Sequence, residues 1–151
     1  MHTTYLLKRY IVVAMLSMIL ISAISYGLET FTGVKLGSTI GIVAAIVPAM
    51  DAGQTYAKRW EKRPPNAYAW KLSAAFTVLN LLVGIVLMIS LFAYFGTVKD
   101  LSDLIGQLAT PLSGVIMVVI LIVYWLASRY FFGFSAKNYL KAVARLAAKK
   151  S

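Results

Sequence analysis

Long apolar runs separated by short polar segments are the dominant pattern along this chain of 151 residues. Four of these runs are close to the length of about 20 residues that a helix needs to cross a bilayer. They cover about residues 10–28, 36–57, 70–95 and 108–132. We therefore expect an all-α fold, in which residues 1–134 form a bundle of four transmembrane helices.

The polar segments contain signals that end one helix and begin the next. Pro64 and Pro65 cannot continue a helix between the second and third runs, and Asn66 is the expected N-cap of the third helix. Residues 135–151 have their own pattern, with basic side chains on one arc and apolar side chains on the other. The basic residues are spaced by four: Lys137, Lys141, Arg145 and Lys149. This predicts a separate basic amphipathic helix, capped by Ser135, that lies on the membrane surface.

Composition supports the membrane interpretation. The chain is 60% hydrophobic and only 13% charged, with a mean hydropathy of +0.79. A soluble domain is nearer half apolar and a quarter charged. The apolar content is therefore too high for a surface that faces water, and an integral membrane protein is expected.

The basic residues are distributed unevenly between the two ends of the predicted bundle. The net charge is +10, and thirteen of the fifteen Lys and Arg residues precede the first run, separate the second from the third, or begin at Arg129. This alternation predicts that both termini face the cytoplasm. It also argues against nucleic acid as the partner. For residues 135–151 we expect anionic lipid headgroups as the partner, with an acidic protein surface as the alternative.

The N-terminal run loosely resembles a signal peptide, because Lys8 and Arg9 precede an apolar stretch. The apolar stretch continues to about Leu28, which is longer than a usual signal core. A membrane helix is therefore the expectation.

Small residues occupy every fourth position across the second run. The row comprises Gly33, Gly37, Gly41, Ala45, Ala49, Gly53 and Ala57. Such rows let helix backbones approach closely in lipid. A spacing of four carries the row about 240° around the helix. We therefore expect the part up to Ala45 and the part from Ala49 to contact different helices, with Pro48 bending the span between them. The row favours packing within the bundle, and an interface with another subunit is the alternative.

Asp51 is a carboxylate within the second apolar run, where a charge costs about 3 kcal/mol at the centre of a span. It lies about seven residues before Lys58, near the predicted cytoplasmic boundary. Arg129 is the first choice of partner and Lys58 the second. An ion pair or hydrogen-bonded acid is the favoured role, and proton or cation handling and substrate contact are the alternatives.

Further polar residues could extend the surroundings of Asp51 into a small cleft. Gln54, Thr55 and Tyr56 follow it along the second run, and Asn80 lies near the middle of the third. An amide at that depth most often makes a hydrogen bond between helices, worth about 0.6 kcal/mol. The candidate intramembrane polar site therefore comprises Asp51, Gln54, Asn80 and Arg129.

Several classes of chemistry lack the residues they need. The chain has no cysteine and one histidine, His2. Thiolate sites, zinc hydrolases and hydrolytic triads are therefore excluded. The glycines follow a packing period rather than a phosphate-binding pattern. We expect no cofactor, no metal and no enzymatic activity.

One stretch resembles a known group of proteins. It reads Pro48-Ala-Met-Asp51-Ala-Gly-Gln-Thr-Tyr-Ala-Lys-Arg59, followed by Pro64-Pro65 and Trp70. This stretch is similar to a family of small uncharacterised bacterial inner-membrane proteins with about four predicted helices. The resemblance covers residues 48–70 and implies a bacterial cytoplasmic membrane location. It implies no activity, cofactor or partner.

These observations favour an accessory or assembly subunit that packs against other membrane proteins or against copies of itself. The alternative is a small oligomeric carrier or channel for protons or cations that uses Asp51. A third option is a lipid- or stress-response protein acting through its basic tail.

Overall fold

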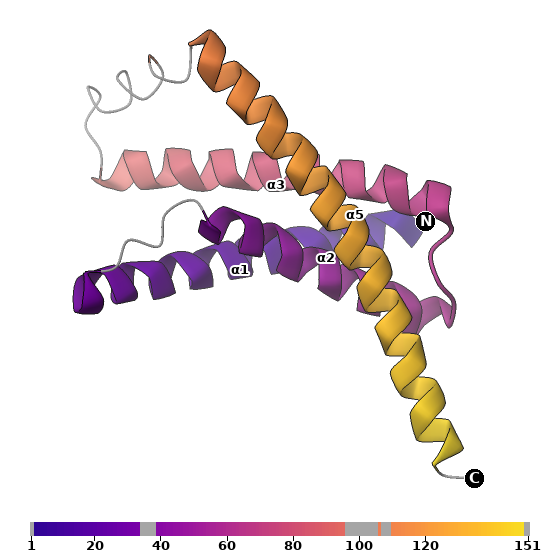
Figure 1. Ribbon diagram of the computed structural model, residues 1–151. Coiled ribbons are helices and arrows are strands. Elements are labelled where there is room, and N and C mark those ends of the chain that lie inside the picture. Colours follow the sequence, from indigo (N-terminus) through magenta and orange to yellow (C-terminus); the bar gives the residue numbers. More distant parts are fainter. Residues whose placement is uncertain (1, 34–38, 96–105, 107–109, 150–151) are drawn as a thin grey trace.

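The computed structural model describes residues 2–33, 39–95, 106 and 110–149, and the elements in this part of the chain are helices (Figure 1). They are α1 (His2–Thr32), α2 (Thr39–Trp60), α3 (Asn66–Phe95) and α5 (Pro111–Ala148). The prediction of an all-α fold is confirmed.

Three of the described helices are long and apolar enough to cross a membrane. The segments are Thr3–Thr32, Asn66–Ser90 and Pro111–Lys149. They indicate a membrane protein. Within the described residues α2 is not among them. The structure thus contains three helices of the length and apolar character predicted for membrane spans, whereas a fourth span and the orientation of the termini stay predictions.

Local signals set the ends of these helices. Gly33 ends α1 with a positive φ of 69°, and its amide donates to the carbonyl of Glu29 at 3.0 Å. This is a common way to close a helix, since glycine adopts that conformation without strain. Thr110 caps α5 by accepting a hydrogen bond from the Ser113 amide, and Pro111 follows as the first helical residue.

The four helices pack against one another over only part of their length. The buried residues of α1 lie between Leu6 and Ser17, those of α3 between Ala69 and Val83, and those of α5 between Ser128 and Ala136. We call the region formed by residues 5–17, 45–60, 66–83 and 128–140 the packed half. Here α2 packs against α1 and α5, and α3 packs mainly against α5.

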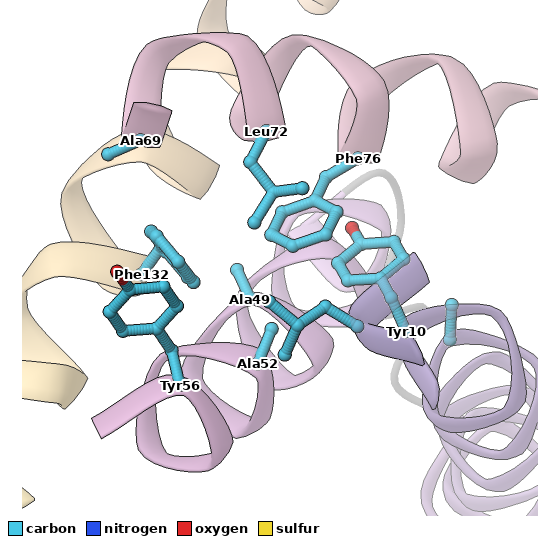
Figure 2. Packing of buried hydrophobic residues seen from close by; sticks show 10 residues of the cluster. Tyr10, Ala49, Ala52, Tyr56, Ala69, Leu72, Phe76 and Phe132 are labelled. Carbon is cyan, nitrogen blue, oxygen red and sulfur yellow. The ribbon is translucent and has the colours of Figure 1, made fainter. Parts of the chain in front are cut away.

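Aromatic rings fill the centre of the packed half (Figure 2). Tyr10 of α1 stacks on Phe76 of α3, with ring centroids 3.9 Å apart and the planes 3° from parallel. Phe132 of α5 meets Phe76 edge-on at 5.8 Å and Tyr56 of α2 at 6.0 Å. Ala49 and Ala52 leave room for these rings on α2. Each helix therefore contributes to one shared core.

The backbones of α2 and α5 meet where they cross. A Cβ atom added to Gly53 would lie 2.3 Å from the carbonyl oxygen of Phe132 and 3.2 Å from the Cβ of Ser135. One turn away, the Ser135 hydroxyl donates to the carbonyl of Met50 at 2.7 Å. Glycine is required here because any side chain would separate the two helices.

The helix α5 runs without a break through the predicted boundary at residue 135. Ser135 is 2% exposed and lies inside the helix, so the prediction that it caps a separate amphipathic helix is wrong. Its hydroxyl instead bonds to α2, and Gly133 stays helical. The basic tail is the end of the same helix that begins at Pro111, and in Figure 1 it projects beyond the other helices.

The remaining parts of α1, α3 and α5 are separated. We call residues 18–32, 84–90 and 111–127 the open half, and none of its side chains is buried. In Figure 1 the beginning of α5 diverges from α3 and α1 in this region. A cavity of about 510 Å³ lies between the three helices, lined mostly by Met, Leu and Ile side chains.

Candidate functional site

Asp51 pairs with Arg9 of α1. The Nε atom of Arg9 donates to Oδ2 of Asp51 at 2.7 Å, and Nη2 donates to Oδ1 at 2.8 Å. This two-pronged arrangement uses both carboxylate oxygens and is the strong form of the interaction. The Arg9 side chain is 44% exposed and that of Asp51 is 26% exposed. The charge of Asp51 is therefore neutralised at the edge of the packed half.

The predictions of Arg129 and then Lys58 as partners of Asp51 are wrong. Arg129 lies on α5 with its guanidinium 5.5 Å from the ring centre of Trp70, and its Nη2 donates to the side-chain oxygen of Asn66. Asn66 therefore begins α3 but directs that oxygen at α5. The prediction missed Arg9 because it placed Lys8 and Arg9 before the first span, whereas α1 begins at His2 and carries Arg9 alongside α2.

An open cavity of about 500 Å³ surrounds this ion pair, and we call it the Asp51 cavity. Three helices line it, with Tyr5 and Arg9 from α1 and Tyr139 from α5. The α2 side chains in its lining are Asp51, Gln54, Thr55, Lys58 and Arg59. The structure thus brings Asp51 and Gln54 together, as the sequence predicts. It adds one cation from α1 and a phenol hydroxyl from each of α1 and α5.

Positive charge exceeds negative charge in the Asp51 cavity. Its charged residues are Arg9, Lys58, Arg59 and Asp51, and Asp51 is already paired with Arg9. Arg59 lies 4.7 Å from the ring centre of Tyr5, a cation–π contact that leaves its charge uncompensated. Among the described residues neither Lys58 nor Arg59 forms an ion pair. The cavity is therefore suited to bind an anion.

Asn80 lies apart from the Asp51 cavity, so the predicted cleft that joins the two is wrong. Its side chain is 3% exposed and borders the apolar cavity of the open half. The Tyr10 hydroxyl lies beside the side chains of Asn80 and Ser128. Among the described residues these three polar groups have one another as polar neighbours, on α1, α3 and α5. The hydrogen bond between helices expected for Asn80 stays a prediction.

The row of small residues divides between two structural roles. Gly33 ends α1 and is exposed, so its predicted part in helix packing is wrong. Gly37 and the surroundings of Gly41 lie outside the described residues. The rest of the row is buried in α2: Ala45, Ala49, Gly53 and Ala57. Of these, Gly53 faces α5 and Ala49 faces the shared core. Both residues therefore pack against helices of the same chain.

The basic residues of the tail that the structure describes are exposed. They are Lys137, Lys141, Arg145 and Lys149, and all lie on α5 or at its C-cap. From residue 141 onward each described side chain is exposed, so this end of α5 makes no buried contact with the described part of the chain. Its surface is available to lipid or to a partner.

The described residues contain few acidic side chains. No group of three or more His, Asp or Glu side chains in the described ranges could hold a metal ion. The polar chemistry concentrated in the Asp51 cavity consists of cations, hydroxyls and an amide around one neutralised carboxylate. Such a set can bind an anion and hold helices together.

Comparisons with known proteins give no further assignment. No protein-family model matches this chain, no curated protein is detectably similar to it, and no solved structure matches it.

Proposed function

We propose that this protein is a non-enzymatic accessory subunit that packs against other membrane proteins. The observation that carries the proposal is the lack of packing around the first half of α5. Only 6% of its most apolar stretch is buried within the chain, compared with 33% for α3. Apolar helices face lipid without cost, so exposure alone does not require a partner.

The glycines of the open half add support for a protein partner. Gly27, Gly84 and Gly114 lie on three different helices, and a Cβ atom added to any of them would have no neighbour within 4 Å. Glycine weakens a helix by about 1 kcal/mol relative to alanine. In membranes such residues are typical of surfaces where another helix approaches closely. A helix from another subunit, or from a second copy, fits the open half in this respect.

We further propose that the protein is in a bacterial inner membrane with both termini in the cytoplasm. The distribution of the basic residues supports this orientation. The resemblance over residues 48–70 supports the location. With this orientation the Asp51 cavity and the basic end of α5 lie on the cytoplasmic side.

A carrier or channel that uses Asp51 remains the alternative function. The open Asp51 cavity favours it, because water can reach the carboxylate. The two hydrogen bonds from Arg9 argue against it, since they already occupy both carboxylate oxygens of Asp51 and tie the side chain to α1. The accessory role therefore explains Asp51 more simply, as an anchor between α1 and α2.

Photocrosslinking in native membranes tests the accessory role. A crosslinking amino acid at Val115 or Val119 would sit on the open half of α5, where both side chains are more than half exposed. Val78, equally exposed on α3 of the packed half, is the matched control. We expect a protein adduct of defined mass from the α5 positions and lipid adducts from Val78. Lipid adducts alone from all three positions would contradict the proposal.

A further inference from the structure

We propose that the Asp51 cavity is a binding site for the phosphate headgroup of an anionic phospholipid. The site is distinct from the basic residues at the end of α5, since among the described tail residues Tyr139 alone lines it. A volume of about 500 Å³ is sufficient for a headgroup. The ligand chemistry is that of a phosphate diester, which carries one negative charge and only accepts hydrogen bonds from the protein.

The charges of the cavity match such a ligand. Lys58 and Arg59 lie in the last turn of α2, and in the described part of the chain neither has an anionic partner. The carboxylate in the described lining, Asp51, is neutralised by Arg9. An incoming phosphate would therefore meet two uncompensated positive charges.

Neutral donors surround these cations. The hydroxyls of Tyr5, Thr55 and Tyr139 and the amide of Gln54 line the same cavity. They come from α1, α2 and α5, so the donor set exists only when these three helices are packed together. Tyrosine side chains are also typical of the depth at which lipid headgroups lie.

The surface next to the cavity is suited to acyl chains, which favours a lipid over a soluble phosphate. Helices α1 and α2 run antiparallel, with Arg9 level with Asp51. One helical turn or two further into the membrane, Val12 and Leu16 continue the face of Arg9, and Val47 and Val43 continue the face of Asp51. All four are exposed, between 41% and 63%. Polar cavity and apolar stripe thus form one continuous amphipathic surface.

Lipid binding to the purified full-length protein tests this site. In a neutral detergent, native mass spectrometry would compare phosphatidylglycerol with phosphatidylcholine and with soluble glycerol phosphate. We expect clear binding of phosphatidylglycerol, weaker binding of the zwitterionic lipid and little binding of glycerol phosphate. Equal binding of both lipids would overturn the headgroup site. Equal binding of glycerol phosphate and phosphatidylglycerol would overturn the lipid assignment.

Paired variants separate this site from general attraction to positive charge. Lys58→Gln with Arg59→Gln removes two charges from the cavity, and Lys141→Gln with Arg145→Gln removes two from the exposed tail. We expect the first pair to weaken phosphatidylglycerol binding about 30-fold, since each basic residue near anionic lipid contributes about fivefold. The second pair should change it less than about threefold. Equal losses would mean that no specific site exists.

A single substitution tests the same site if the double variant of the cavity fails to fold. Lys58 makes no ion pair with the described residues, so Lys58→Glu should preserve the helical circular dichroism of the protein. It should nevertheless reduce phosphatidylglycerol binding more than Lys141→Glu does. Equal binding by these two charge-reversed variants would overturn the proposal.

Discussion

The guanidinium of Arg9 and the carboxylate of Asp51 join α1 to α2 at a half-exposed position. A pair of this kind contributes less than its geometry indicates, because water and salt screen it. Its two aligned hydrogen bonds and its limited exposure bring its stabilising free energy towards the upper end of the range for surface ion pairs. At the scale of single residues, Asp51 is therefore an anchor between two helices.

A double-mutant cycle measures this anchor. Arg9→Gln and Asp51→Asn should each lower the free energy of unfolding in mixed micelles, with a coupling of about 1 kcal/mol between them. Arg129→Gln combined with Asp51→Asn is the control, and these effects should add because Arg129 contacts Asn66 and Trp70 instead. Additive effects of the Arg9 and Asp51 substitutions would show that the pair contributes nothing.

The same Asp51→Asn variant distinguishes the anchor from a carrier. As an anchor, Asp51 is needed for stability, and proteoliposomes with the wild-type protein should show no proton or cation flux above empty vesicles. A flux that the folded Asp51→Asn variant abolishes would instead establish the carrier. The residue is neutralised by Arg9 in the structure, which favours the first outcome.

Gly53 gives a second prediction at the residue scale. Gly53→Ala places a methyl group 2.3 Å from the Phe132 carbonyl oxygen, which is backbone and cannot move aside alone. We expect a loss of about 2–3 kcal/mol in the free energy of unfolding. Gly84→Ala meets no atom within 4 Å and should be neutral or stabilising by up to about 1 kcal/mol. Similar effects of the two substitutions would contradict the close crossing of α2 and α5.

At the scale of elements, α5 is the largest departure from the sequence prediction. The change from apolar to basic composition near Ser135 predicts two helices, but composition determines where a helix sits and not where it ends. Neither glycine nor serine at 133–135 breaks α5, because the contact with α2 holds this stretch in helical form. The apolar runs, by contrast, predict the existence of the helices well, since long helices depend on local pattern.

Spin labels can measure the continuity of α5. Val123 and Val143 are both exposed, and twenty residues of straight helix separate them. At 1.5 Å per residue, the backbone distance is about 30 Å. Double electron–electron resonance in vesicles should therefore give one narrow distribution near this value. A broad distribution at shorter distances would indicate a hinge near Ser135 and restore the separate tail helix.

The partners of charged groups could not be predicted, for a physical reason. A basic residue of α5 and one of α1 are equally able to pair with Asp51, and only the packing of α2 between the two helices decides which is used. Gln54 lines the same cavity as Asp51 because it follows Asp51 by three residues on one helix. Asn80 lines a different cavity, since its place depends on how α3 packs against α1 and α5.

At the scale of the whole molecule, stability is concentrated at one end. The packed half contains the aromatic core, the α2–α5 crossing and the Arg9–Asp51 pair. The open half has no buried side chain among the described residues. Local unfolding of the open half should therefore cost less free energy than local unfolding of the packed half.

Hydrogen exchange in detergent tests this difference between the halves. Amides in residues 18–32 and 84–90 should exchange at least about tenfold faster than those in residues 49–57 and 72–80. A partner that covers the open half would remove the difference, so the comparison is made on the isolated protein and repeated in native membranes. Uniform protection in the isolated protein would contradict the division into two halves.

The crossing at Gly53 has a mechanical consequence for α5. The helix is continuous from Pro111 to Ala148 and touches α2 most closely at Phe132 and Ser135, between its two ends. A stiff rod held near one point pivots about that point. Any molecule that pushed the apolar end of α5 sideways would swing its basic end the opposite way. Binding to the open half would therefore displace the basic residues at the far end of the same helix.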